Sequence, residues 1–189
     1  ITPENVIAEQ EPEGEIEVIA TGEAEDDNYN VDSASTATGT DTPLRDIPQS
    51  IQVVPRQVIE DRNARTVVET VETVSGVIDR GNNFGIPSQS LTIRGFEQEG
   101  NFRNGYRDVS RFEIAGSTNT IEQIEVLKGP ASIQFGQVEP GGIVNVITRQ
   151  PLDEPYYNLE FEAGNFDLYQ PIVDLSGPLA ADDTVLYRF

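Results

Sequence analysis

The chain has 189 residues, a hydrophobic content of 37% and a net charge of −21 at pH 7, from 12 Lys and Arg against 33 Asp and Glu. It contains no Cys and no His, which excludes disulfides, thiol nucleophiles, Ser-His-Asp triads and metal sites built from His or Cys. The negative charge argues against nucleic acid as a partner, because phosphate binding needs a cluster of cations and the sequence has none.

Residues 1–41 form an acidic leader that we expect to be disordered. From Ile1 to Leu44 the chain has twelve Asp or Glu and no Lys or Arg. Such a segment, which also has few aromatics, buries too little apolar surface to offset its ordering entropy. Within it, residues 16–22 (IEVIATG) form an alternating apolar patch. The patch is either a chance cluster in a tail or a β-prone segment that adds as a strand to the sheet edge of a partner.

Folded structure is predicted to begin directly after the leader. An alternating run at residues 50–54, between two prolines, indicates a short strand. Residues 56–74 carry apolar side chains at helical spacing, and Asn63 should divide them into two short helices. Thr66 is placed to cap the second helix, with Glu69 three residues later as a capping box.

The middle of the chain is predicted to alternate short strands with loops. Residues 75–80 indicate a turn and a short strand, followed by a Gly, Asn and Ser rich loop at 81–90. Residues 91–96 alternate apolar and polar side chains, which predicts one continuous strand. Residues 97–105 are expected to form a polar loop.

The most informative stretch is Ile121–Arg149. It opens with an alternating apolar run that Gly129-Pro130 ends, and a short turn or helix is expected around residues 131–135. Glu139-Pro140-Gly141-Gly142 predicts a tight turn, because Pro fixes one φ angle and Gly permits positive φ. The β-branched run that follows, residues 143–148, indicates a mostly buried strand.

Three further alternating runs follow, around residues 157–163, 173–176 and 185–189. This period is the weak signature of a transmembrane β-barrel, although a half-buried soluble sheet has the same pattern. No run of about 18 apolar residues exists, so the sequence encodes no membrane helix.

Two linked blocks of this sequence closely resemble the signature of the plug domain in TonB-dependent outer-membrane receptors. Residues 124–130 (IEVLKGP) match the pattern I-E-x-[IV]-x-[RK]-G-P, and residues 135–149 (FGQVEPGGIVNVITR) match the block that follows it, in order and spacing. Residues 42–54 and the segment LTIRGF at 91–96 resemble two earlier plug motifs. The sub-pattern QVEPGG at 137–142 is similar to the siderophore-receptor branch.

This resemblance implies a fold and a location. It implies an α+β plug domain, with a mixed sheet and short helices, over residues 42–151, then the first strands of an antiparallel transmembrane β-barrel over 152–189. The chain would then be a fragment, because receptors of this family close a 22-stranded barrel around the plug. The resemblance places the whole protein in the cell outer membrane, with lipid around the barrel and the plug facing the periplasm.

The resemblance also implies a function: transport without catalysis, in which a ferric siderophore is taken up with energy supplied by TonB. No cofactor is expected, since iron enters only as part of the ligand. The residues that the resemblance assigns fall into three groups. The TonB box is Glu17, Val18, Ile19, Ala20 and Thr21. The ligand-binding plug apex comprises Arg80, Phe84, Phe96, Gln98, Gly100, Asn101, Phe102, Arg103, Tyr106 and Phe112. The plug–barrel charge contacts are Arg94 and Lys128, whose partners would be barrel carboxylates.

Two alternatives stay open. A receptor of the same family could import cobalamin, haem or a glycan instead of a ferric siderophore. A soluble periplasmic interaction or signalling module could also have been derived from a plug. Each apex residue could equally be a solvated loop side chain, and Arg94 and Lys128 could be exposed basic residues without a barrel partner.

Overall fold

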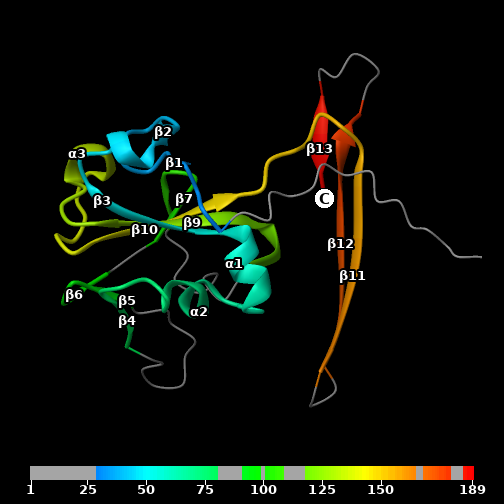
Figure 1. The fold of residues 1–189 in the computed structure, drawn as a ribbon, viewed down its shortest axis with the longest axis horizontal. Coiled ribbons are helices and arrows are strands. Elements are labelled where there is room, and N and C mark those ends of the chain that lie inside the picture. The colour runs from blue at the N-terminus through cyan, green and yellow to red at the C-terminus, as the bar shows by residue number, and fades with distance from the viewer. Residues whose placement is uncertain (1–28, 81–90, 99–100, 109–117, 165–167, 180–184) are drawn as a thin grey trace, which may run out of the picture.

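The structure, a computed structural model, describes residues 29–80, 91–98, 101–108, 118–164, 168–179 and 185–189 (Figure 1). Its centre is a five-stranded mixed sheet, in the order β3 (Ser50–Pro55), β9 (Ile121–Lys128), β10 (Gly142–Thr148), β7 (Asn101–Arg103) and β8 (Tyr106–Asp108). β9 runs antiparallel to both β3 and β10, whereas β7 runs parallel to β10. The α+β architecture expected from the sequence is therefore present.

The signature stretch folds as its pattern predicts. β9 ends at Lys128, and α3 (Ser132–Phe135) follows. The amide of Gly142 then donates to the carbonyl of Glu139 across the Pro-Gly-Gly turn, at 3.3 Å. β9 and β10 pair from Lys128 opposite Gly142 to Ile121 opposite Thr148. These two adjacent strands occupy the middle of the sheet.

Two short helices, α1 (Arg56–Asp61) and α2 (Val67–Val71), cover one face of the sheet. The break predicted at Asn63 is confirmed, because this residue has a positive φ of 49° between the helices. Thr66 caps α2 as predicted, since its hydroxyl accepts the Glu69 amide at 3.2 Å. The Glu69 carboxylate reaches back one residue further than a capping box requires, to the amide of Arg65.

Side chains are buried on both faces of the sheet, which explains why β10 is an almost uninterrupted apolar run and why β9 is buried continuously from Ile124 to Leu127. The apolar cluster on the helix side joins residues of α1 and α2, such as Ile59 and Val71, to Ile124 and Val144 of the sheet. A second cluster on the opposite face joins Ala34, Ala37, Ile47, Phe102, Leu127, Ala131 and Ile143.

The second cluster corrects the expectation of a leader that is disordered up to residue 41. Strand β1 (Ser33–Ala34) pairs with β2 (Thr42–Pro43), and the turn η1 (Leu44–Asp46) follows. Ala34 is 1% exposed and Thr36 3% exposed. Small side chains of low hydrophobicity can be buried here because the sheet supplies the apolar surface. Local composition contains no information about that contact.

A smaller three-stranded sheet contains β4 (Val77–Asp79), β5 (Leu91–Ile93) and β6 (Phe96–Glu97). The prediction of one continuous strand over residues 91–96 is wrong. Arg94 and Gly95 both have positive φ, 51° and 87°, and form a two-residue hairpin turn of the kind that matches strand twist. The hairpin pairs Ile93 with Phe96.

The predicted loop over residues 97–105 is also wrong in part, because β7 occupies residues 101–103. Phe102 is 3% exposed and lies opposite Asn145 of β10 in the sheet register. Its ring meets Phe135 edge-on, with the centroids 4.7 Å apart. Pairing with a strand more than forty residues later produces β7, which a reading of local alternation misses.

The last part of the chain forms a separate antiparallel sheet of β11 (Tyr156–Gly164), β12 (Leu168–Pro178) and β13 (Leu186–Arg188). Figure 1 shows it as a long hairpin standing beside the mixed-sheet domain. The predicted alternation is confirmed, since one face exposes the large apolar side chains of Tyr157, Leu159, Phe161, Tyr169, Val173 and Phe189. The other face contacts the mixed-sheet domain. No helix in the described ranges is long and apolar enough to cross a bilayer.

Candidate functional site

Several of the predicted site residues lie outside the described residues. These are the five box residues Glu17, Val18, Ile19, Ala20 and Thr21, and the apex candidates Phe84, Gly100 and Phe112. The remaining candidates for ligand binding lie on β4 to β8 or next to them, and they divide by exposure.

Three described candidates present their side chains to solvent. Phe96 is 50% exposed and Tyr106 is 80% exposed, each beside a hairpin turn. Arg80 follows β4, and its guanidinium lies 3.2 Å from the Glu97 carboxylate of β6. An aromatic ring and a guanidinium near one edge of the small sheet are suited to a polar ligand with apolar rims.

Three other candidates are buried. Phe102 packs into the second apolar cluster, and Asn101 beside it is 6% exposed. Gln98 is 8% exposed, and within the described part of the chain neither atom of its carboxamide finds a hydrogen-bond partner. Gln98 borders a cavity of about 10 Å³ together with Phe102 and Arg107, enough space for one water molecule. Arg103 is half-buried and lies 3.8 Å from Asp108.

Arg94 and Lys128, the two cations predicted to contact a barrel, lie next to each other. The Arg94 guanidinium donates to the Lys128 carbonyl at 3.4 Å. The Lys128 ammonium donates to the side chains of Gln52 and Ser75, at 3.0 and 3.1 Å. Among the residues that the structure describes, no carboxylate pairs with either cation. Burial, together with the repulsion of Arg94, lowers the pKa of Lys128 below its ordinary value.

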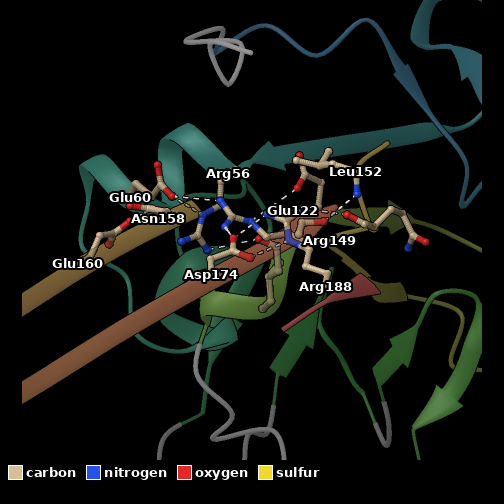
Figure 2. A network of polar contacts seen from close by, with 12 residues as sticks. Arg56, Glu60, Glu122, Arg149, Leu152, Asn158, Glu160, Asp174 and Arg188 are labelled. Atoms are coloured by element: carbon tan, nitrogen blue, oxygen red, sulfur yellow. Dashed lines mark hydrogen bonds and ion pairs between the residues drawn. The ribbon is translucent and has the colours of Figure 1, made fainter. Parts of the chain in front are cut away.

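The ion pairs that join the mixed-sheet domain to the β11–β13 sheet involve other residues. Arg149, directly after β10, has a side chain only 6% exposed and donates to the Asp174 carboxylate of β12. Arg188 of β13 donates to the same carboxylate at 2.7 and 3.0 Å. Figure 2 shows Asp174 between these two guanidinium groups, with Glu60 and Glu122 nearby. Glu60 lies 3.6 Å and Glu122 3.8 Å from the Arg149 guanidinium.

Backbone contacts complete this junction network. The Arg149 amide donates to the Thr120 carbonyl, and the Arg188 guanidinium donates to the Gln150 carbonyl. The Leu152 amide donates to the Ser176 hydroxyl, at 2.8 Å (Figure 2). The first part of the linker between β10 and β11, residues 149–152, is therefore held. A buried charge needs such compensation, so the arrangement is suited to fixing the domain against the sheet.

Sequence reasoning missed this network. Arg149 closes the second signature block, and Asp174 stands at a polar position of an alternating strand, so both charged residues could be identified in the sequence. Their pairing was not, since it depends on how the sheet lies against the domain. A second ion pair, Arg65 with Glu162 of β11, also joins the two parts at a more exposed position.

Comparisons with known proteins agree on one family. The sequence profile described as TonB-dependent Receptor Plug Domain matches residues 43–143. The metal-pseudopaline receptor CntO of Pseudomonas aeruginosa UCBPP-PA14 is 38% identical over 188 residues, which cover 96% of this chain and 26% of that receptor. The ferrichrome outer membrane transporter and phage receptor of Escherichia coli K12 is 31% identical, over 82% of this chain and 22% of that protein.

Solved structures show the same likeness. The ferripyoverdine receptor of the Pseudomonas aeruginosa outer membrane, solved with bound ferripyoverdine, superposes with a TM-score of 0.76 at 25% identity, over 87% of this chain and 22% of that chain. The alcaligin outer-membrane receptor FauA of Bordetella pertussis gives a TM-score of 0.75 at 25% identity, over 87% of this chain and 29% of that one. The chain spans about a quarter of the length of the curated relatives it matches.

Proposed function

Because the chain belongs to the family of TonB-dependent receptor plug domains, we propose that it is the N-terminal part of an outer-membrane receptor that imports a metal chelate, a ferric siderophore in the first instance. One observation carries this proposal. A plug match over residues 43–143 is followed, after the rest of β10 and a short linker, by an antiparallel sheet whose exposed face is apolar. That order of a plug and then strands with a lipid-compatible face is expected of a plugged barrel.

The three groups of sequence-assigned residues receive roles within this proposal. The box at Glu17–Thr21 engages TonB by adding a strand to its sheet. Arg80, Phe96 and Tyr106, together with the candidates outside the described residues, contact the chelate. Arg94 and Lys128 take carboxylate partners from barrel strands beyond residue 189. For Lys128, the lack of a carboxylate partner in the described part of the chain supports this role, since a partly buried cation needs compensation.

The Arg149–Asp174–Arg188 network holds the plug against the first strands of the barrel in this proposal. The side chains of Arg149 and Asp174 are 6% and 12% exposed, so the contact is shielded from the solvent that weakens surface ion pairs. Because this contact fixes one side of the plug, the rest of the plug can change its conformation while the domain stays in the barrel.

A related ligand class has support of its own. The relative that is 38% identical over nearly the whole chain is a receptor for metal-pseudopaline, which is not among the ferric siderophores of the other relatives named above. A metal chelate of that chemical class is therefore the second candidate. Cobalamin, haem and glycans remain candidates from the same family, without a feature of this chain that favours them.

Binding to the full-length receptor in isolated outer membranes tests the ligand class. The panel contains ferric hydroxamate, catecholate and pyoverdine-type siderophores, metal-loaded pseudopaline, cobalamin and haem. The proposal expects saturable binding of one metal chelate and none of cobalamin or haem. Binding of cobalamin or haem alone would contradict it.

A further inference from the structure

Glu125 is a fully buried carboxylate in the middle of β9, with 0% of its surface exposed. Strand alternation directs it away from α1 and α2, to the face that carries the second apolar cluster. A carboxylate in such a place is costly unless each oxygen accepts hydrogen bonds. Its partners therefore indicate why an acid is present between the buried apolar residues Ile124 and Val126.

Most of these partners come from a segment about ninety residues earlier in the chain. The Glu125 carboxylate accepts the amide of Ser35 at 3.1 Å and the amide of Thr36 at 2.7 Å. The Gln123 carboxamide also donates to it, at 2.7 Å. An ionised carboxylate has only acceptor sites, so it can receive two consecutive backbone amides and a side-chain donor together. Such charge-assisted bonds are roughly twice as strong as neutral ones.

Asn145 of β10, directly opposite Glu125 in the register, completes the arrangement. Its side-chain NH₂ group donates to the Thr36 hydroxyl at 2.8 Å, and its side-chain oxygen accepts the backbone amide of Gly105 at 3.0 Å. Both side chains belong to the two central strands. They hold residues 35 and 36 at the point where the N-terminal segment crosses the sheet.

The segment held in this way, residues 33–43, is here called the strap. Its own secondary structure is slight, since β1 and β2 share only two residue pairs. Ala34 and Ala37 bury little apolar surface compared with larger side chains. The hydrogen bonds to Glu125 and Asn145 are therefore the main specific attachment of the strap to the sheet. Figure 1 shows β1 and β2 on the opposite side of the central sheet from α2.

We propose that Glu125 and Asn145 form a polar clasp that holds the strap, and that this clasp is the first point to resist a pull on the leader. Opening the clasp frees the strap and exposes the strip of sheet around these two side chains. The released carboxylate is then hydrated, so opening exchanges one set of hydrogen bonds for another. The mechanical role rests on the proposed function, in which the leader binds TonB. The clasp itself does not depend on it.

Glu125→Gln is the direct test, because it keeps the shape and removes the charge. A carboxamide has only one acceptor oxygen, and its NH₂ group would face one of the N–H donors that now bind the carboxylate. Hydrogen exchange is measured on the full-length receptor without any partner. We expect the Ser35 and Thr36 amides to exchange at least about tenfold faster, while α1, α2 and β10 are unchanged. Asp46→Asn is the control, since it removes the same charge from an exposed carboxylate next to the strap.

A second variant keeps the test decisive if Glu125→Gln fails to fold. Thr36→Val removes only the bond from Asn145 and keeps both amide contacts to the carboxylate. It should raise exchange a few-fold, within the strap alone. Unchanged strap exchange in the variant that folds, or an equal rise throughout the plug, would overturn the clasp.

The mechanical role is tested by pulling the leader of the membrane-embedded receptor with a single-molecule force probe. The clasp predicts a first rupture at lower force in Glu125→Gln than in the wild type or in Asp46→Asn. Equal forces in all three would overturn its role in resisting the pull. Since no TonB is present, these results stand apart from uptake. A receptor that proved independent of TonB would still show the clasp, and loss of the clasp with normal uptake would leave the proposed function intact.

Discussion

Arg149, the last residue of the plug signature, donates to Asp174 of β12, and so the plug is joined by an ion pair to the sheet that follows it. The same carboxylate also accepts Arg188 from β13. One acid thus compensates two guanidinium groups that come from different parts of the chain. The mixed-sheet domain and the β11–β13 sheet consequently share one charged centre, in which Asp174 is the carboxylate in hydrogen-bond contact with both guanidinium groups.

Asp174→Asn should be the most costly change in this network. It leaves Arg149 and Arg188 without their common partner, and we expect the free energy of unfolding to fall by about 3 kcal/mol. Arg149→Gln should cost less, because Asp174 keeps its bonds to Arg188. Denaturant unfolding of the full-length receptor measures both.

The exposed ion pair between Arg65 and Glu162 offers a matched control for that experiment. The Arg65 side chain is 49% exposed, so Arg65→Gln should cost less than about 1 kcal/mol. If Asp174→Asn proved no more destabilising than Arg65→Gln, the network would not be what holds the plug against the sheet.

Gly141→Ala should destabilise the plug through a steric clash alone. A Cβ at this position would lie 2.2 Å from the Ile93 carbonyl oxygen and 2.9 Å from the Phe96 Cβ. The φ angle of Gly141 is not in the left-handed region, so a side chain there adds no backbone strain. We expect a loss of more than about 2 kcal/mol, because two backbone segments would have to separate. Thermal unfolding measures the change.

Gly39→Ala separates the clash from backbone strain. Gly39 has a φ of +77°, and a Cβ added there would meet no atom within 4 Å, so only the left-handed conformation is penalised, by about 1 kcal/mol. A larger loss for Gly39→Ala than for Gly141→Ala would show that the close approach to Ile93 does not constrain the turn.

The pKa of Lys128 should distinguish the 189-residue chain from the full-length receptor. In the chain, burial and Arg94 lower this pKa, so between the lowered value and 10.5 the unfolded state binds more protons than the folded state. The free energy of unfolding therefore rises with pH across that window. Barrel carboxylates beside Lys128 would raise its pKa and reverse the trend. NMR titration of the Lys128 side chain in both proteins gives the comparison, and equal values would argue against a plug–barrel contact there.

The sequence predicted the elements that depend on neighbours along the chain. The β9–turn–β10 unit, the division of the helix near Asn63 and the Thr66 cap each rest on residues within one turn or strand of each other. The turn at Arg94-Gly95 was missed because an alternating pattern continues through it, although Gly95 could have indicated a break.

What was missed depends on contacts between distant segments. β7 forms because Phe102 can be buried beside β10, and the strap is ordered because Glu125 receives its amides. Asp174 looks like any polar residue of an alternating strand until Arg149 is placed against it. These partners lie between 25 and 90 residues apart in sequence, beyond the reach of any local pattern.

Energy-dependent uptake of a radiolabelled ferric siderophore, by cells that produce the full-length receptor, tests the central claim most directly. Val18→Pro is compared with the wild type, because Pro removes a backbone donor that the proposed box would need to pair with the sheet of TonB. We expect uptake in the wild type, loss of uptake in Val18→Pro, and equal binding of the chelate to both. Undiminished uptake in Val18→Pro would contradict the box assignment, and the absence of uptake for every metal chelate would contradict the receptor itself.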